Sequence, residues 1–184
     1  MKPKFGDKVE AIVERSAPSK ADFGVTSSWK WEHWRDEKLI DVWEERNVCT
    51  TEGLTHILNV QFHGEAASAT WYIALFEDDY TPLITNTYAV PGYTESTAYT
   101  EATRPAFVEA EAAAKTITNS ANKADFTMNA TKTIYGASLV DDNTKDDVAA
   151  ANAVLFCSSK FSAAKSVVSA DVLKVTITIT SSDM

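Results

Sequence analysis

The strongest constraint on the fold is a strict alternation of side chains near the C-terminal end of the chain. Residues 172–180 place apolar and mainly polar side chains on opposite faces of an extended segment. The apolar face holds Leu173, Val175, Ile177 and Ile179, and the other face holds Val172, Lys174, Thr176, Thr178 and Thr180. A period of two with one apolar face predicts a β-strand that is packed on one side and solvated on the other. Such a strand requires a second layer to cover its apolar face.

A second region of alternation predicts a β-hairpin. Trp29, Trp31 and His33 fall on one face of a strand, and a second strand follows in the sequence KLIDVWEERN. The charged residues 35–37 form the turn between them. Four of the five tryptophans lie in this hairpin. Because tryptophan combines a large apolar ring with a polar N–H, such a cluster is typical of either a core edge or an interface anchor.

One helix is predicted, over about residues 51–63. Thr50 or Thr51 can cap its N-terminus, Glu52 is an acid in the first turn, and Gly64 is a natural stop. The apolar residues at helical spacing are Leu54, Ile57, Leu58 and Phe62. We expect this stripe to lie on a sheet.

The rest of the chain predicts further short strands. TWYIALF reads as a buried strand, and a long proline-containing loop follows over residues 78–94. Residues 95–120 contain one or two strands, residues 123–142 contain two around a turn at 129–131, and AVLFCSSKFS contains another. The predicted fold is a mainly β protein, a jelly-roll-like or immunoglobulin-like β-sandwich with one short α-helix packed on the sheet.

The first 28 residues are mixed and polar, and we place them outside the sandwich, which occupies residues 29–184. Only a short strand around residues 9–14 is indicated. The segment is either a floppy terminus or an extended arm that becomes ordered against a neighbouring subunit.

Composition argues against several functions. The net charge is -9 with a pI of about 4.8, and the basic residues are scattered, so we expect no direct nucleic-acid binding. No window approaches the roughly 18 apolar residues of a membrane span, and the N-terminus lacks a signal-peptide core. We therefore expect no membrane association, and a chain that stays in the cytoplasm or leaves by lysis.

No catalytic, metal or cofactor motif is found. His56 and His63 are seven residues apart rather than the four that favour a helical metal pair, and the acidic loop 141–147 puts Lys145 where a calcium ligand is needed. Cys49 and Cys157 read as two buried free thiols, with a disulfide possible but not indicated. We predict that the chain is not an enzyme and binds no cofactor or metal.

Five segments, in this order, resemble a family of small structural proteins of tailed bacteriophages. They are a strand ending at Asn47 followed by GLTHILNVQFHG, then TWYIAL, AYTEATRP, NSANKADFTMNATKTIYGASLV, and the Ala-Asp-x-Leu-x-Val-Thr strand at residues 170–176. They span about residues 39–180. The sequence LFEDDYTP departs from the family, whose members tend to carry a glycine-containing turn there. Within AYTEATRP, we interpret Glu101 and Arg104 as an ion pair that orders the chain beside Pro105.

The resemblance implies a virion structural protein, with a capsid decoration (cement) role as the first expectation. The implied partner is the major capsid protein, the implied location is the capsid exterior after assembly in the host cytoplasm, and we expect a dimer or trimer because multivalent contact retains each copy. The hypothesised partner-binding residues are Phe5, Val9, Ile12, Trp29, Trp31, Trp34, Tyr80, Tyr88 and Tyr93.

The alternative is a head-fibre, tail-fibre or tail-adaptor module that binds a host-surface glycan. In that case the tyrosines of loop 78–94 would stack on sugar rings.

Overall fold

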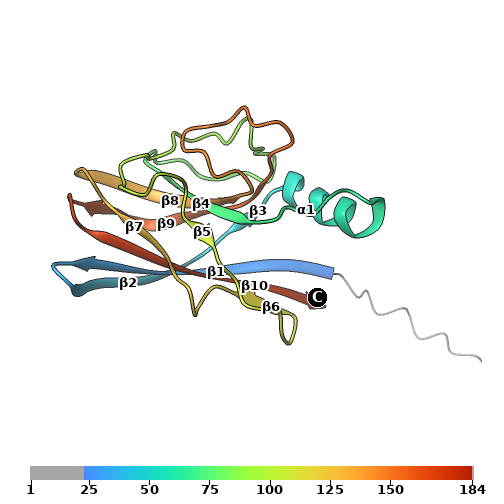
Figure 1. Cartoon of the computed structure of the whole chain (residues 1–184), viewed down its shortest axis with the longest axis horizontal. Helices are drawn as coiled ribbons and strands as arrows, with labels where there is room; N and C mark the ends of the chain where they lie inside the picture. The colour runs from blue at the N-terminus through green and yellow to red at the C-terminus, as the bar shows by residue number, and fades with distance from the viewer. Residues whose placement is uncertain (1–22, 184) are drawn as a thin grey trace, which may run out of the picture.

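The computed structural model describes residues 23–183 as two packed antiparallel sheets with a helix at one end (Figure 1). One sheet has the strand order β2-β1-β10-β6, with β7 also paired to β10. The other has the order β3-β9-β8-β4-β5. The strands of the first sheet are β1 (Phe23–Arg35), β2 (Lys38–Arg46), β6 (Thr116–Thr118), β7 (Ala124–Thr127) and β10 (Val172–Asp183). Those of the second are β3 (Val48–Cys49), β4 (Trp71–Phe76), β5 (Ala106–Phe107), β8 (Lys132–Val140) and β9 (Leu155–Val167). The predicted mainly β sandwich with one short helix is confirmed.

The alternating C-terminal strand is the centre of the first sheet. β10 pairs with β1 along one side and with β6 and β7 along the other. Leu173, Val175 and Ile177 are fully buried, as the alternation predicts. They meet Ile73, Leu75 and Leu139 from the second sheet in a single large core cluster. The apolar face of β10 therefore forms one half of the sandwich interior.

The predicted hairpin is confirmed as β1–β2. Asp36 and Glu37 connect the two strands with positive φ angles of 49° and 61°, as expected for a two-residue turn that matches the strand twist. Trp29, Trp31 and His33 share the buried face.

The proposed boundary at residue 28 is wrong. β1 begins at Phe23, and residues 23–28 pair with residues 178–183 of β10. These residues belong to the sandwich because they extend the same ladder as the hairpin. The predicted arm can therefore include only residues 1–22, and both it and the strand predicted over residues 9–14 lie outside the described residues.

The two strands predicted around residues 129–131 exist but do not pair with each other. β7 joins β10 in the first sheet, whereas β8 pairs with β4 and β9 in the second. The chain crosses between the layers at this point, a feature that strand periodicity alone does not reveal.

The helical segment comprises α1 (Thr51–Leu58) and a π-helical turn η1 (Asn59–His63) that ends at Gly64 with φ 76°. It projects from the end of the sandwich where β1 begins (Figure 1).

Candidate protein-binding surface

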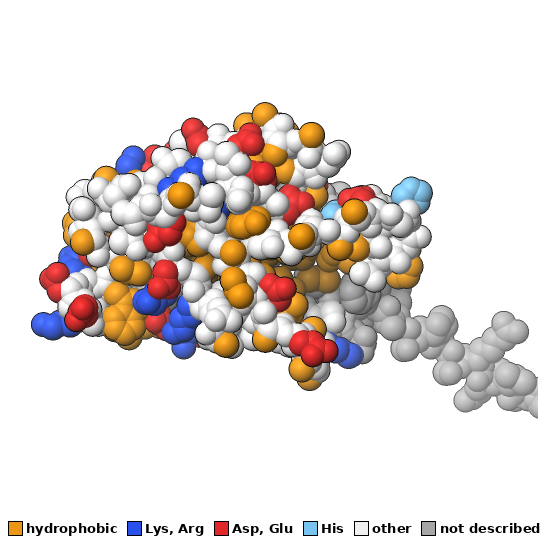
Figure 2. Space-filling model, in the orientation of Figure 1, with side chains coloured by type: hydrophobic (Ala, Val, Ile, Leu, Met, Phe, Trp, Pro, Cys, Tyr) orange, Lys and Arg blue, Asp and Glu red, His pale blue; other side chains and the backbone are white. Residues whose placement is uncertain are grey.

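The helix turns most of its apolar residues toward solvent. Leu54, Leu58 and Phe62 are 39%, 54% and 85% exposed. Only Ile57 of the predicted stripe packs against the core. The expectation that the whole stripe covers a sheet is therefore wrong. Three large apolar side chains at a spacing of four residues form an uncovered face on the projecting helix, which we call the outer helix face. In Figure 2 the helix stands out to one side of the sandwich, with some hydrophobic atoms exposed on it.

The leucines face solvent because the opposite side of the helix packs against the sandwich. Gly53 and His56 are the buried residues of α1. The backbone at Gly53 is so close to β9 that a Cβ there would lie 2.6 Å from the Cα and the carbonyl oxygen of Phe156. Close backbone approach is a use for which glycine is suited. The helix thus docks through its smallest residue, and its leucines point away.

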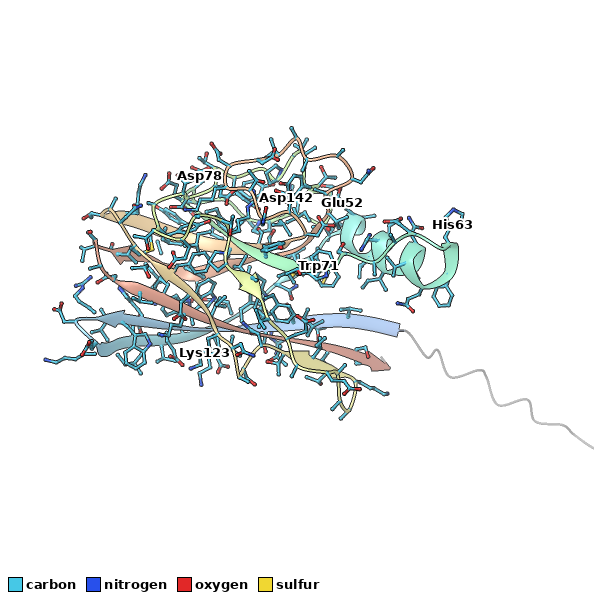
Figure 3. All side chains as sticks on the ribbon, viewed as in Figure 1. Glu52, His63, Trp71, Asp78, Lys123 and Asp142 are labelled. Atoms are coloured by element: carbon cyan, nitrogen blue, oxygen red, sulfur yellow. The ribbon has the colours of Figure 1, made fainter. Side chains whose placement is uncertain are left out.

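Hydrogen bonds at the N-terminus of α1 fix this orientation. The Thr50 hydroxyl accepts from the Gly53 amide at 2.9 Å, as predicted for an N-cap, and also bonds to the carbonyl of Leu155. The Glu52 carboxylate accepts from the amides of Tyr88 and Leu155, both at 2.8 Å. Figure 3 shows Glu52 at the root of the helix and His63 at its far end. The helix is held at its root while its outer face stays free.

The loop over residues 78–94 adds exposed apolar side chains beside the helix root. The Thr51 amide donates to the carbonyl of Ile84 at 2.8 Å, and both Leu83 and Ile84 are more than half exposed. The Asn86 side chain accepts from the Leu83 amide at 2.7 Å and donates to the Tyr80 hydroxyl at 2.9 Å. The loop is therefore internally braced, and it presents apolar residues next to those of α1.

A cavity of about 930 Å³ lies between the helix and this loop. In its wall His56 Nδ1 lies 2.8 Å from Glu65 Oε1, and His56 Nε2 lies 3.2 Å from Ser68 Oγ. This is the order of a serine–histidine–acid triad. However, the Ser68 hydroxyl donates to Asp141 Oδ2 at 2.7 Å, so its proton is held by a carboxylate and not offered to the imidazole. These contacts join α1 to Glu65 and Ser68 and, through Ser68, to Asp141.

An apolar crevice of about 280 Å³ opens near the base of the helix. Ile57, Trp71 and Phe156 form one side, and Ile117 and Ile179 of the first sheet form the other. Trp71 is visible between helix and sandwich in Figure 3. The two sheets are thus incompletely closed at the helix end.

The buried side chain of Arg104 connects the loop that contains Glu95 with the loop over residues 141–147. Arg104 makes a bidentate pair with Glu95, with Nε–Oε1 at 2.9 Å and Nη2–Oε2 at 2.6 Å, and donates to the Tyr88 hydroxyl at 3.0 Å. The predicted pair with Glu101 is wrong, because that carboxylate accepts from the amide of Thr127 instead. Arg104 also donates to the carbonyls of Asp142 and Asp147. It has a structural role in joining two loops.

Of the nine hypothesised partner-binding residues, three are buried, three are partly exposed and three lie outside the described residues. Trp29 and Trp31 are fully buried, because they lie opposite Ile177 and Val175 of β10 and face the other sheet, so they cannot serve as exposed anchors. Tyr88 is also buried, and its ring packs against the Arg104 guanidinium. The remaining aromatic residues, Trp34, Tyr80 and Tyr93, are partly exposed, and Phe5, Val9 and Ile12 lie outside the described residues.

The surface that the structure does present was missed because helical spacing locates an apolar stripe without saying which way it faces. A signal was available in Gly53 and His56, which lie three residues apart on the face opposite the leucines. A glycine within a helix often marks a close contact.

Among residues 23–183, no group of three or more histidine, cysteine, aspartate or glutamate side chains is arranged to hold a metal ion. Within the same range, no helix is long and apolar enough to span a bilayer. Neither a comparison with models of known protein families nor a search of curated proteins finds a match.

Proposed function

We propose that this chain is a structural protein of a bacteriophage virion, a capsid decoration protein that binds the outer surface of the mature head and stabilises contacts between major capsid protein subunits. The outer helix face carries the proposal. Leu54, Leu58 and Phe62 project from a helix whose root is fixed by hydrogen bonds, an arrangement suited to insertion between neighbouring protein subunits. The resemblance of residues 39–180 to phage structural proteins supports the choice of partner.

Physical chemistry supports a protein partner for this face. A mobile apolar tail collapses onto itself, whereas a helix held at its root keeps its side chains presented at little further entropic cost. Burying the outer helix face together with Leu83 and Ile84 would remove five exposed apolar side chains from water. Binding only to the expanded shell would stabilise that shell by mass action.

Two single substitutions on α1 and η1 test this proposal. Leu58→Glu places a charge in the proposed contact, and Gln61→Glu places the same charge on an exposed position of the adjacent turn. We expect Leu58→Glu to lower co-sedimentation with expanded capsids at least about ten-fold, and Gln61→Glu to change it less than about two-fold. Circular dichroism and thermal unfolding should be used to check that both variants are folded. Equal binding by the two variants would overturn the assignment of the surface.

One observation favours the alternative function, a fibre or tail module that binds a glycan. The wall of the 930 Å³ cavity includes the hydroxyl of Thr55 and the amides of Asn59 and Asn152, and such groups can form hydrogen bonds with a hydroxyl-rich ligand. Titration calorimetry with host-surface glycans tests this function, and Thr55→Val, which removes an exposed hydroxyl from the cavity wall, should weaken any binding seen.

A further inference from the structure

The two cysteines are brought into direct opposition by the fold, although 107 residues separate them in sequence. Cys49 of the short edge strand β3 lies opposite Cys157 of β9 in antiparallel register. Opposed residues of an antiparallel pair point to the same face with Cβ atoms about 4.5–5.5 Å apart. A disulfide requires about 3.5–4.5 Å. A small shift of a two-residue edge strand suffices to close that gap.

The two thiols have different surroundings. Cys157 is fully buried in the core cluster, whereas Cys49 is only partly buried and lines a cavity of about 440 Å³. The Asn47 amide donates to Cys49 Sγ at 3.3 Å, and the Cys49 thiol lies 3.6 Å from the carbonyl of Val25. Cys49 is therefore the more accessible of the two cysteines.

The two thiols also differ in pKa. A bond from Cys157 lowers the pKa of Cys49 to about 7 although burial opposes the change, and Asn47 adds to the effect. Burial raises the pKa of Cys157, and its bond to Cys49 raises it further. Cys49 is therefore the more readily ionised of the two thiols. An accessible thiolate beside a second thiol is the arrangement of a redox-responsive pair.

We propose that Cys49 and Cys157 are a hydroperoxide-responsive pair that closes an intramolecular disulfide between β3 and β9. The Cys49 thiolate attacks a peroxide oxygen, the O–O bond breaks, and the departing hydroxide takes a proton to form water, leaving a sulfenic acid on Cys49. The Cys157 sulfur then attacks the Cys49 sulfur. The S–O bond breaks, and the hydroxide leaves with the Cys157 proton as a second water. Two thiols are oxidised and one peroxide is reduced.

The disulfide would restrain the N-terminus of α1. Cys49 immediately precedes Thr50, the N-cap of α1. Closing the bond would fix this crossing between the sheets, and with it the start of the helix. This inference is independent of the partner proposed above.

The test uses the reduced full-length chain treated with stoichiometric hydrogen peroxide near pH 7.5. We expect an intact mass lower by about 2 Da, a single crosslinked peptide joining residues 49 and 157, and a monomer on a non-reducing gel. The rate should rise with pH through about 7, following the Cys49 thiolate. Cys49→Ser should slow peroxide consumption at least about ten-fold, and Cys157→Ser should give a sulfenic acid that dimedone traps.

Three results would overturn the proposal. They are disulfide-linked dimers in place of the internal bond, oxygen addition to wild-type protein without loss of two hydrogens, or reaction of Cys49→Ser at the wild-type rate. Because crosslink mapping and the pH–rate profile use the unaltered chain, they decide the question even if a variant misfolds.

Discussion

At the scale of single residues, the fold depends on buried charges that are fully partnered. Arg104 is 3% exposed at its side chain and Glu95 is 7% exposed. Although burial opposes it, the pairing with Glu95 raises the pKa of Arg104. Asp171 is equally enclosed and accepts both Arg35 contacts at 2.7 Å and one from His33 at 2.8 Å. Such groups contribute little when paired and cost much when one partner is removed.

Arg104→Met should therefore destabilise the protein by about 3–5 kcal/mol, because it leaves the Glu95 carboxylate buried without its partner. Adding Glu95→Gln should recover part of that loss, since the remaining group is neutral. Urea unfolding of the wild type, the two single variants and the double variant measures the coupling. Strictly additive effects would contradict the pairing.

Asp171 predicts a specific dependence of stability on pH. Burial opposes ionisation, but the hydrogen bonds from Arg35, the Val168 amide and His33 hold the pKa of Asp171 well below its usual value. A carboxyl group with a lowered folded pKa stabilises the fold above its unfolded pKa of about 3.9 and loses that contribution as the pH falls further.

Asp171→Asn should accordingly destabilise the protein at pH 7 by about 2–4 kcal/mol. The difference from wild type should stay constant down to about pH 5 and shrink by up to about 1.4 kcal/mol per pH unit below about pH 4. Urea titrations at pH 7, 5 and 3.5 measure this. A difference that is unchanged at pH 3.5 would show that the Asp171 carboxylate is not the group responsible.

At the scale of elements, the sequence predicts well those features that depend on the periodicity of apolar residues. The alternation of β10 fixes its buried face, and the residue pair Asp36–Glu37 marks the hairpin turn. The same reasoning does not assign β7 and β8 to different sheets, because both partners of a strand are chosen by contacts distant in sequence. It also leaves open whether the tryptophans of β1 face a core or an interface, since an aromatic face fits both, and it proposes Trp29 and Trp31 as partner-binding residues although both are buried.

The orientation of α1 gives the sharpest test at this scale. Gly53→Ala would place a Cβ 2.6 Å from the Phe156 backbone. Although alanine is the better helix former by about 1 kcal/mol, we expect a net destabilisation of about 1–3 kcal/mol from the clash. The adjacent Leu54→Ala, on the exposed face, should change stability by less than about 0.5 kcal/mol.

Thermal and urea unfolding of the two variants measure the difference. If Leu54→Ala proved the more damaging, the leucine face would be the buried one, and the proposed binding surface would be wrong.

At the scale of the whole molecule, the charged and apolar surfaces are unevenly arranged. The described residues carry twelve of the seventeen Lys and Arg side chains and twenty-two of the twenty-six Asp and Glu side chains, so the sandwich is more acidic than residues 1–22. The helix, the loop at Leu83–Ile84 and the apolar crevice all gather at the end where β1 begins. Residues 1–22 join the sandwich at that same end. Local sequence patterns do not predict that these features lie close together, because their proximity depends on the tertiary fold.

The most direct test of the account is a cryo-electron microscopy map of the particle that contains this chain. We predict density for many copies on the outside of the shell, with Leu54, Leu58 and Phe62 of each copy buried against capsid subunits. A map in which the sandwich touches the shell while the outer helix face remains in solvent, or in which the chain occurs only at the tail, would contradict the central claim.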